Sequence, residues 1–82
     1  MRLDRLLVNL RFVRTRSQAR SLIEEGHMRI NSVRVSKSSR LVCPGDVVTL
    51  FVDGEVTVAK ISTLPDRRLP PAEAARSWHK LS

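Results

Sequence analysis

The sequence predicts a small α+β domain in which two short N-terminal helices pack on a mostly antiparallel sheet built from hairpins, followed by a short C-terminal helix. Three observations support this fold class. Apolar residues recur at helical spacing up to about residue 25 and at every second position from Met28. Asp53-Gly54 lies between two apolar runs and is a strong hairpin signal. The 82 residues are sufficient for one domain with a modest core.

The first helix is predicted over residues 3–9. Its apolar positions follow the i, i+3, i+4, i+7 spacing of a core-facing side: Leu3, Leu6, Leu7 and Leu10. Asn9 lies off this side. Asp4 falls in the first turn, where a carboxylate interacts favourably with the helix dipole.

The second helix is predicted from Arg16 to Glu25. Thr15 and Gln18 have the spacing of a capping box, in which the two side chains bind the first backbone amides. Gly26 suits the left-handed position that ends a helix. The apolar side comprises Ala19, Leu22 and Ile23. Arginine side chains around a helix N-terminus suit phosphate, and three of them cluster near this one: Arg14, Arg16 and Arg20.

Strands are predicted over residues 28–31, 33–36, 40–42, 47–52 and 55–61. Tight turns are expected at Asn31-Ser32, at Pro44-Gly45-Asp46 and at Asp53-Gly54, where the residue types tolerate turn conformations. The alternation places Arg29, Arg34 and Lys37 on one exposed surface of the sheet.

The chain divides at about residue 64. Residues 1–64 are expected to form the main domain, and residues 65–82 a proline-containing linker and a short helix that opens at Pro71. One side of that helix would comprise Ala72, Ala75, Trp78 and Leu81. Trp78 is expected to dock on the sheet rather than to stack on a base.

The positive charge is confined to the first half of the chain. The net charge is +7, and residues 1–40 contain ten basic and three acidic residues, whereas residues 41–82 contain five of each. Arginine outnumbers lysine twelve to three, which favours bidentate contacts to phosphate. This asymmetry indicates a surface that faces a polyanion.

Several classes of function lack support in the sequence. Cys43 is the single cysteine and the two histidines are isolated, so neither a disulfide nor a metal site is expected. No cofactor motif, nucleophile with an adjacent base or paired catalytic carboxylates are present, so the protein is not expected to be an enzyme. Neither a membrane span nor a signal peptide is evident. We therefore expect a cytoplasmic protein. Because no surplus apolar stripe is evident, we expect it to be a monomer.

The N-terminal half resembles the S4-type RNA-binding domain. The matching residues are Arg2-Leu3-Asp4, the Thr-Arg-Ser-x-Ala run at residues 15–19, Ile23-x-x-Gly26, Asn31 and Gly45-Asp46. The resemblance implies the S4-type fold and an RNA-contact surface on the helix pair and the adjoining hairpin. The residues that it implicates in RNA binding are Arg5, Arg14, Thr15, Arg16, Gln18, Arg20, Arg29, Asn31, Arg34 and Lys37.

The C-terminal part has a narrower resemblance. Arg67-Arg68-x-Pro70 followed by the Ala-Glu-Ala-Ala run is similar to the small, ribosome-associated heat-shock protein family of about fifteen kilodaltons. That resemblance implies rescue or recycling, under stress, of the free large ribosomal subunit that carries a stalled nascent chain on its tRNA. Two other functions stay open: binding of tRNA or other structured RNA away from the ribosome, and a basic protein-interaction module.

Overall fold

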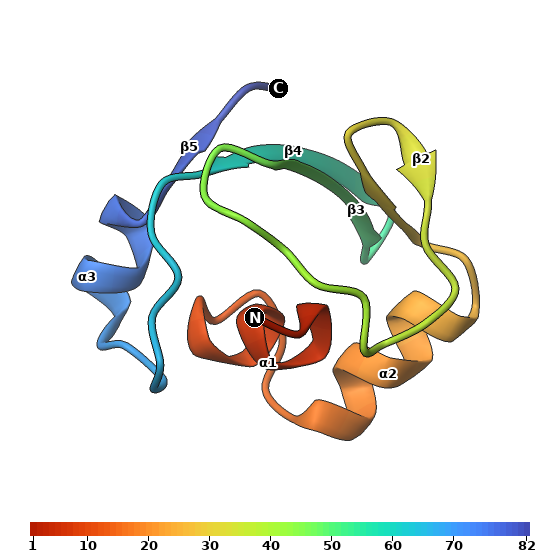
Figure 1. The fold of residues 1–82 in the computed structure, drawn as a ribbon, viewed down its shortest axis with the longest axis horizontal. Coiled ribbons are helices and arrows are strands. Elements are labelled where there is room, and N and C mark those ends of the chain that lie inside the picture. The colour runs from red at the N-terminus through yellow and green to blue at the C-terminus, as the bar shows by residue number, and fades with distance from the viewer.

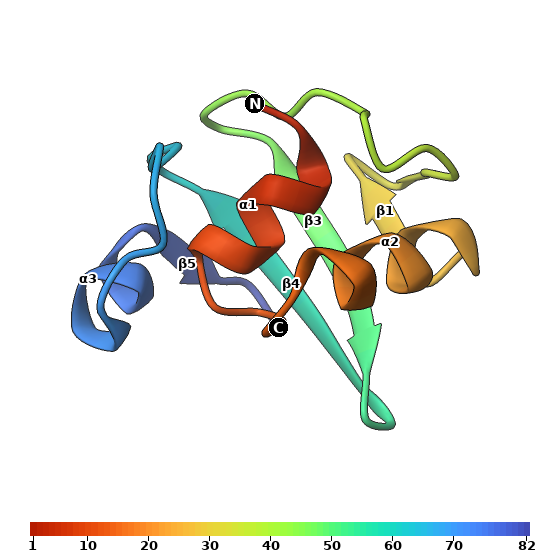
Figure 2. The same cartoon turned by 90° about the horizontal axis from the view of Figure 1, so that it is seen from below.

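The computed structural model describes residues 1–82. It contains three helices and five strands: α1 (Leu3–Asn9), α2 (Arg16–Glu24), β1 (Met28–Ile30), β2 (Val33–Arg34), β3 (Val47–Val52), β4 (Glu55–Ile61), α3 (Pro71–Arg76) and β5 (Trp78–Lys80). The strands form one antiparallel sheet in the order β2-β1-β3-β4-β5. Helices α1 and α2 cover one face of this sheet, and no helix covers the other (Figures 1 and 2). The predicted fold class is confirmed.

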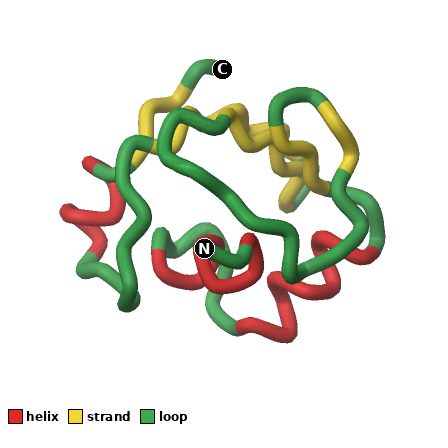
Figure 3. The backbone as a smooth tube through the Cα atoms, viewed as in Figure 1, coloured by secondary structure: helices red, strands yellow, loops and turns green.

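The core lies between the two N-terminal helices and the covered face of the sheet. Leu3, Leu6 and Leu7 of α1 are completely buried, as the helical spacing predicts. The three inner strands of the sheet, β1, β3 and β4, contribute alternate residues: Met28, Ile30, Val48, Leu50, Ala59 and Ile61. Long loops connect the layers, and the loop between β2 and β3 passes close to the start of α1 (Figure 3).

Both ends of α2 are fixed by local hydrogen bonds. Thr15 Oγ1 accepts the N–H of Gln18 at 3.1 Å, which confirms the predicted N-cap. Gln18 Oε1 accepts the N–H of Arg14 at 2.9 Å rather than that of Thr15, so the cap is a variant of the predicted box. Helix α2 ends at Glu24, one residue before the predicted end, and Gly26 follows with φ +84°. The hydrogen bonds after the helix, from Gly26 to Ile23 and from His27 to Leu22, are those of a Schellman motif.

The predicted hairpins are confirmed, and one predicted strand is wrong. Both residues of the Asn31-Ser32 and Asp53-Gly54 turns have positive φ, as type I′ turns require. The expected strand over residues 40–42 is reduced to one bridge between Arg2 and Leu41. The pairing cannot extend because the partner segment enters α1 at Leu3.

The C-terminal segment joins the sheet. Helix α3 ends at Arg76, and Trp78 begins β5, where it pairs with Ile61 of β4. The predicted helical side that included Trp78 and Leu81 is therefore wrong, because the edge of β4 offers backbone groups that pairing satisfies. Trp78 packs against the core from β5, with its ring centroid 4.9 Å from that of Phe12, and does not dock a helix on the sheet as predicted.

The linker before α3 lies against α1. Asn9 was expected off the buried side, but it is only 6% exposed. Its Nδ2 donates to the carbonyl of Pro65 at 2.9 Å, and its own carbonyl accepts the N–H of Leu69 at 3.1 Å. These bonds pair the side-chain Nδ2 and the backbone carbonyl of Asn9 and fix the path of the linker.

Candidate functional site

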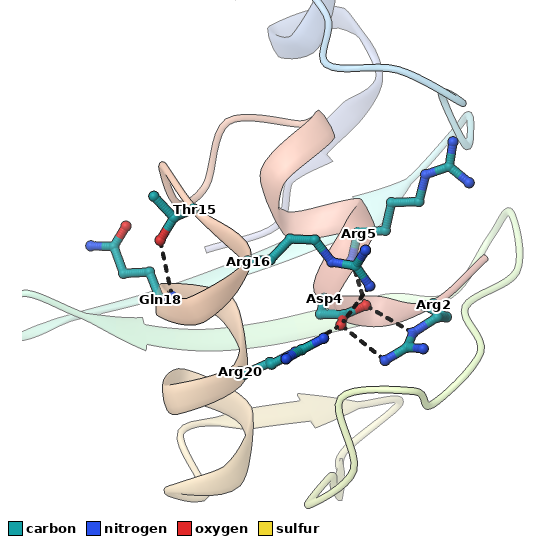
Figure 4. A network of polar contacts seen from close by, with 7 residues as sticks. All are labelled: Arg2, Asp4, Arg5, Thr15, Arg16, Gln18 and Arg20. Carbon is teal, nitrogen blue, oxygen red and sulfur yellow. Dashed lines mark hydrogen bonds and ion pairs between the residues drawn. The ribbon is translucent and has the colours of Figure 1, made fainter.

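A buried carboxylate holds three arginines at the junction of α1 and α2. Asp4 is completely buried. Its carboxylate accepts two hydrogen bonds from Arg2, at 3.2 and 3.1 Å, and one from Arg16 at 3.2 Å. Arg20 Nε lies 3.7 Å from Asp4 Oδ2. Figure 4 shows the three guanidinium groups converging on this one side chain of α1, two of them from α2 and one from the segment before α1. We call Arg2, Asp4, Arg16 and Arg20 the Asp4 cluster.

The arginines of the Asp4 cluster are oriented and still accessible. Their side chains are 44%, 50% and 53% exposed for Arg2, Arg16 and Arg20. One carboxylate balances one of three positive charges, so the cluster keeps an excess of two. Because the carboxylate restrains these long side chains before any ligand arrives, less conformational entropy is lost on binding. The cluster can therefore bind an anion such as phosphate.

Asp4 is the source of an expected acid sensitivity. Burial alone raises the pKa of the Asp4 carboxyl, but hydrogen bonds from Arg16, Arg2 and the backbone N–H of Arg5 outweigh it and lower the pKa below its ordinary value. A lowered folded-state pKa stabilises the fold above the unfolded-state pKa of about 3.9. That stability is lost as the pH falls through the folded-state pKa.

We therefore expect the free energy of unfolding to fall below about pH 4. Urea titrations between pH 7 and pH 2.5 measure this. Asp4→Asn should lower the free energy of unfolding at pH 7. It should also reduce the further fall of that free energy below pH 4, because the variant has no carboxyl to protonate at this position. Asp46, whose pKa is lowered by hydrogen bonds from the Cys43 N–H and from Asn31, should supply the residual slope. If the variant lost as much stability below pH 4 as the unmodified protein does, Asp4 would not be the source of the acid sensitivity.

A second group of cations lies beside the Asp4 cluster. The backbone N–H groups of Leu3 and Asp4 donate to the carbonyls of Arg40 and Ser38, at 2.8 and 3.2 Å. This loop lines a pocket of about 290 Å³ that holds three basic side chains and two serine hydroxyls: Arg34, Lys37, Arg40, Ser36 and Ser39. We call these five residues the loop pocket. Because this loop is hydrogen-bonded to the start of α1, the loop pocket lies next to the Asp4 cluster.

The first hairpin adds two arginines on the uncovered face of the sheet. Arg29 and Arg34 are directly opposite each other in the register of β1 and β2. Like charges at opposite positions destabilise a strand pair, so this arrangement favours an anionic ligand that separates them. The guanidinium of Arg34 lies against Gly26, where a Cβ atom would collide with it. The end of α2 thus sets the position of Arg34.

Several predicted site residues lie elsewhere or serve the fold. Arg5 donates to the carbonyl of Asp66 and points away from Asp4 (Figure 4). Thr15 and Gln18 use their polar atoms in the helix cap. Asn31 binds Asp46 and accepts the N–H of Val47 at 2.9 Å. Arg14 does not join Arg16 and Arg20; it lines a separate pocket together with Arg11 and Arg68.

The sequence interpretation missed four members of the two groups: Arg2, Arg40, Ser36 and Ser39. It also assigned Asp4 to the helix dipole. One signal was available, since Asp4 is the only acidic residue among the first 23 and is surrounded by arginines in the sequence. The residues described contain no group of three or more metal-ligating side chains. None of the helices is long and apolar enough to cross a bilayer.

Curated relatives are ribosomal proteins. The chain is 39% identical over 71 residues to the small ribosomal subunit protein uS4 of Sphingopyxis alaskensis, a match that covers 84% of this chain and 35% of that protein. It is also 39% identical over 73 residues to uS4 of Kosmotoga olearia, covering 85% of this chain and 35% of that protein. The chain thus spans about a third of the length of these relatives.

A solved structure matches the whole chain. The trimeric structure of heat shock protein 15 from Vibrio cholerae superposes with a TM-score of 0.93 at 32% identity, and the match covers 100% of this chain and 82% of that one. The family model of the S4 domain matches residues 1–48, which include α1, α2, the first hairpin and the loop pocket. The chain therefore belongs to the S4 family of RNA-binding domains.

Proposed function

We propose that the protein binds structured RNA through the Asp4 cluster and the loop pocket, and that it does so without a catalytic role. The observation that carries this proposal is the convergence of three half-exposed arginines on the buried Asp4. A-form RNA hides its major-groove edges from side chains, so a protein contacts its phosphates, 2′-hydroxyls and unpaired bases. Oriented guanidinium groups beside lysine and serine side chains suit those acceptors.

We further propose that the RNA is part of the large ribosomal subunit carrying a stalled nascent chain on tRNA, and that the protein serves rescue under stress in the cytoplasm. The likeness to the Vibrio heat shock protein covers the whole of this chain and most of that one, and it supports the role under stress. The large-subunit target rests on the resemblance of the C-terminal part to the ribosome-associated heat-shock protein family. The likeness to uS4 supports a small-subunit target as the second candidate, although it covers only 35% of that protein.

We propose that the protein acts as a monomer. The large exposed apolar residues are Val33, Leu41, Phe51, Val56 and Leu81. Only Phe51 and Val56 are paired neighbours in the sheet, so these residues form no broad apolar surface of the kind that oligomers bury. The trimer of the Vibrio structure is a property of that protein, and light scattering tests the state of this one.

Sedimentation of the tagged protein with cell lysate on a sucrose gradient tests the ribosomal target. We expect enrichment with free large subunits, above small subunits and intact ribosomes. Enrichment with small subunits would favour the second candidate. Protein that stays at the top of the gradient would contradict a ribosomal target and would leave free tRNA or another RNA as the ligand.

The salt dependence of binding tests the contacts with phosphate. If four or five cations touch phosphate, the logarithm of the affinity should fall against log salt with a slope of about −3 to −4.5. Lys37→Ala combined with Arg40→Ala should reduce that slope by about two, since each removes one contact. Arg76→Ala is the matched control, because Arg76 is exposed on α3 outside both groups. An affinity independent of salt would contradict phosphate binding.

A further inference from the structure

A third pocket opens on the uncovered face of the sheet, beside the end of α2. Its volume is about 390 Å³, and it is lined by residues of the α2–β1 junction, the first hairpin and the β3–β4 pair: Gly26, His27, Arg29, Ser32, Thr49, Phe51 and Val56. The S4-type resemblance implicates only Arg29 among them. We call it the Phe51 pocket.

Two rings and an aliphatic side chain give the Phe51 pocket an apolar surface. Phe51 is 45% exposed although it lies on the central strand of the sheet, and its strand partner Val56 is 56% exposed. The imidazole ring of His27 lies 6.1 Å from the Phe51 ring, at an interplanar angle of 40°. The backbone N–H of Phe51 also donates to the carbonyl of His27 at 3.1 Å, which holds the two residues together. This surface can accept a flat ring on the face of Phe51.

The rest of the Phe51 pocket is polar and basic. Arg29 and Thr49 are direct partners in the register of β1 and β3. Arg34 is opposite Arg29, lies against Gly26 and also lines the loop pocket. The side chain of Arg34 therefore connects the Phe51 pocket with the loop pocket, which suits phosphate.

We propose that the Phe51 pocket binds one unpaired nucleobase of the RNA whose backbone lies on the loop pocket. This inference rests on the proposed RNA binding and adds a feature of the ligand, namely a bulged or loop nucleotide next to an A-form stem. Bases that leave the helix stack on phenylalanine, histidine and arginine side chains. The hydroxyls of Ser32 and Thr49 are available to the edge of the base.

Charge favours a nucleotide over a second copy of the chain. Phe51 and Val56 could in principle pack against another protein, but Arg29 and Arg34 stand beside them. A second copy carries the same net charge of +7, so its approach would be repelled. A nucleotide carries an aromatic base and a negatively charged phosphate close together. The base suits the Phe51 side of this surface, and the phosphate suits the side of Arg29 and Arg34.

The test compares two RNAs that share one stem. One RNA is a fully paired hairpin, and the other carries a single bulged 2-aminopurine, whose fluorescence reports stacking. The unmodified protein should bind the bulged RNA about ten-fold more tightly, as one stacked base provides, and should change its fluorescence. Phe51→Ala should remove this preference and the fluorescence change while leaving the affinity for the paired hairpin unaltered. Leu81→Ala, which truncates an apolar residue of similar exposure, is the control.

The outcomes separate the pocket from the RNA binding on which it rests. Equal, salt-dependent affinity of the unmodified protein for both RNAs would overturn the base pocket and leave the proposed function standing. Binding of neither RNA would overturn both. A lower molecular mass of Phe51→Ala in light scattering would show that the pocket joins copies of the chain instead. If Phe51→Ala fails to fold by circular dichroism, His27→Ala, which removes the second ring from an exposed position, must show the same selective loss.

Discussion

The protein with Arg16→Ala and Arg20→Ala is expected to lose stability and RNA affinity together. Both arginines contact the carboxylate of Asp4, which has no exposed surface. Their removal leaves Arg2 as the only charged partner, and a buried charge that loses partners is destabilising. We expect a loss of about 2–3 kcal/mol. RNA affinity should fall roughly 100-fold, with a salt slope smaller by about two.

Adding Asp4→Asn separates the two effects. The triple variant no longer buries a carboxylate, so urea unfolding should show that most of the lost stability returns. Its RNA affinity should stay low, because the two cations are still missing. If affinity returned together with stability, Arg16 and Arg20 would serve the fold alone and the RNA site would lie elsewhere. Affinities are compared at one fixed salt concentration, because the electrostatic contribution depends on it.

Most of the fold could be predicted because local signals determine it. The bounds of α1, β3 and β4 match the predicted ranges, and each of these elements has a regular apolar pattern that ends at a turn or cap. The Asp53-Gly54 turn has φ values of +52° and +77°, a conformation that these two residue types tolerate. Such signals depend on a few neighbouring residues and can therefore be recognised in a single sequence.

The features that the sequence does not predict depend on contacts between segments far apart in the chain. Strand β5 forms because β4 has a free edge some twenty residues earlier, and nothing near Trp78 indicates this. Asn9 is buried because Pro65 accepts its hydrogen bond. The loop at Arg40 joins the site because it bonds to the start of α1.

The candidate site follows the same division. Its charge and its arginine-rich start were evident from composition, whereas the role of Asp4 depends on three partners brought together by folding. A helix-dipole interpretation of Asp4 needs only the sequence, and it was the simplest one available. The S4-type resemblance implicates Arg5 and Asn31 in RNA contact, but their side chains bind other parts of this chain.

Ile23→Ala should destabilise the protein far more than Leu22→Ala. Helical spacing places both residues on the apolar side of α2, so the sequence predicts similar costs. In the structure Ile23 is 0% exposed within the core, whereas Leu22 is partly buried at its edge. Truncation of a fully buried isoleucine costs about 2–5 kcal/mol, because apolar contacts are lost and a cavity remains.

Because the domain is small, the difference in stability between the Ile23→Ala and Leu22→Ala variants should be easy to measure. A chain of this length is expected to have a total stability of roughly 4–12 kcal/mol, so Ile23→Ala should remove a large share of it and lower the urea midpoint steeply. Leu22→Ala should shift the midpoint much less, because water already reaches part of that side chain. Equal shifts would mean that α2 is rotated relative to the sheet. Since Arg16 and Arg20 lie on the same helix, such a rotation would also move them away from Asp4.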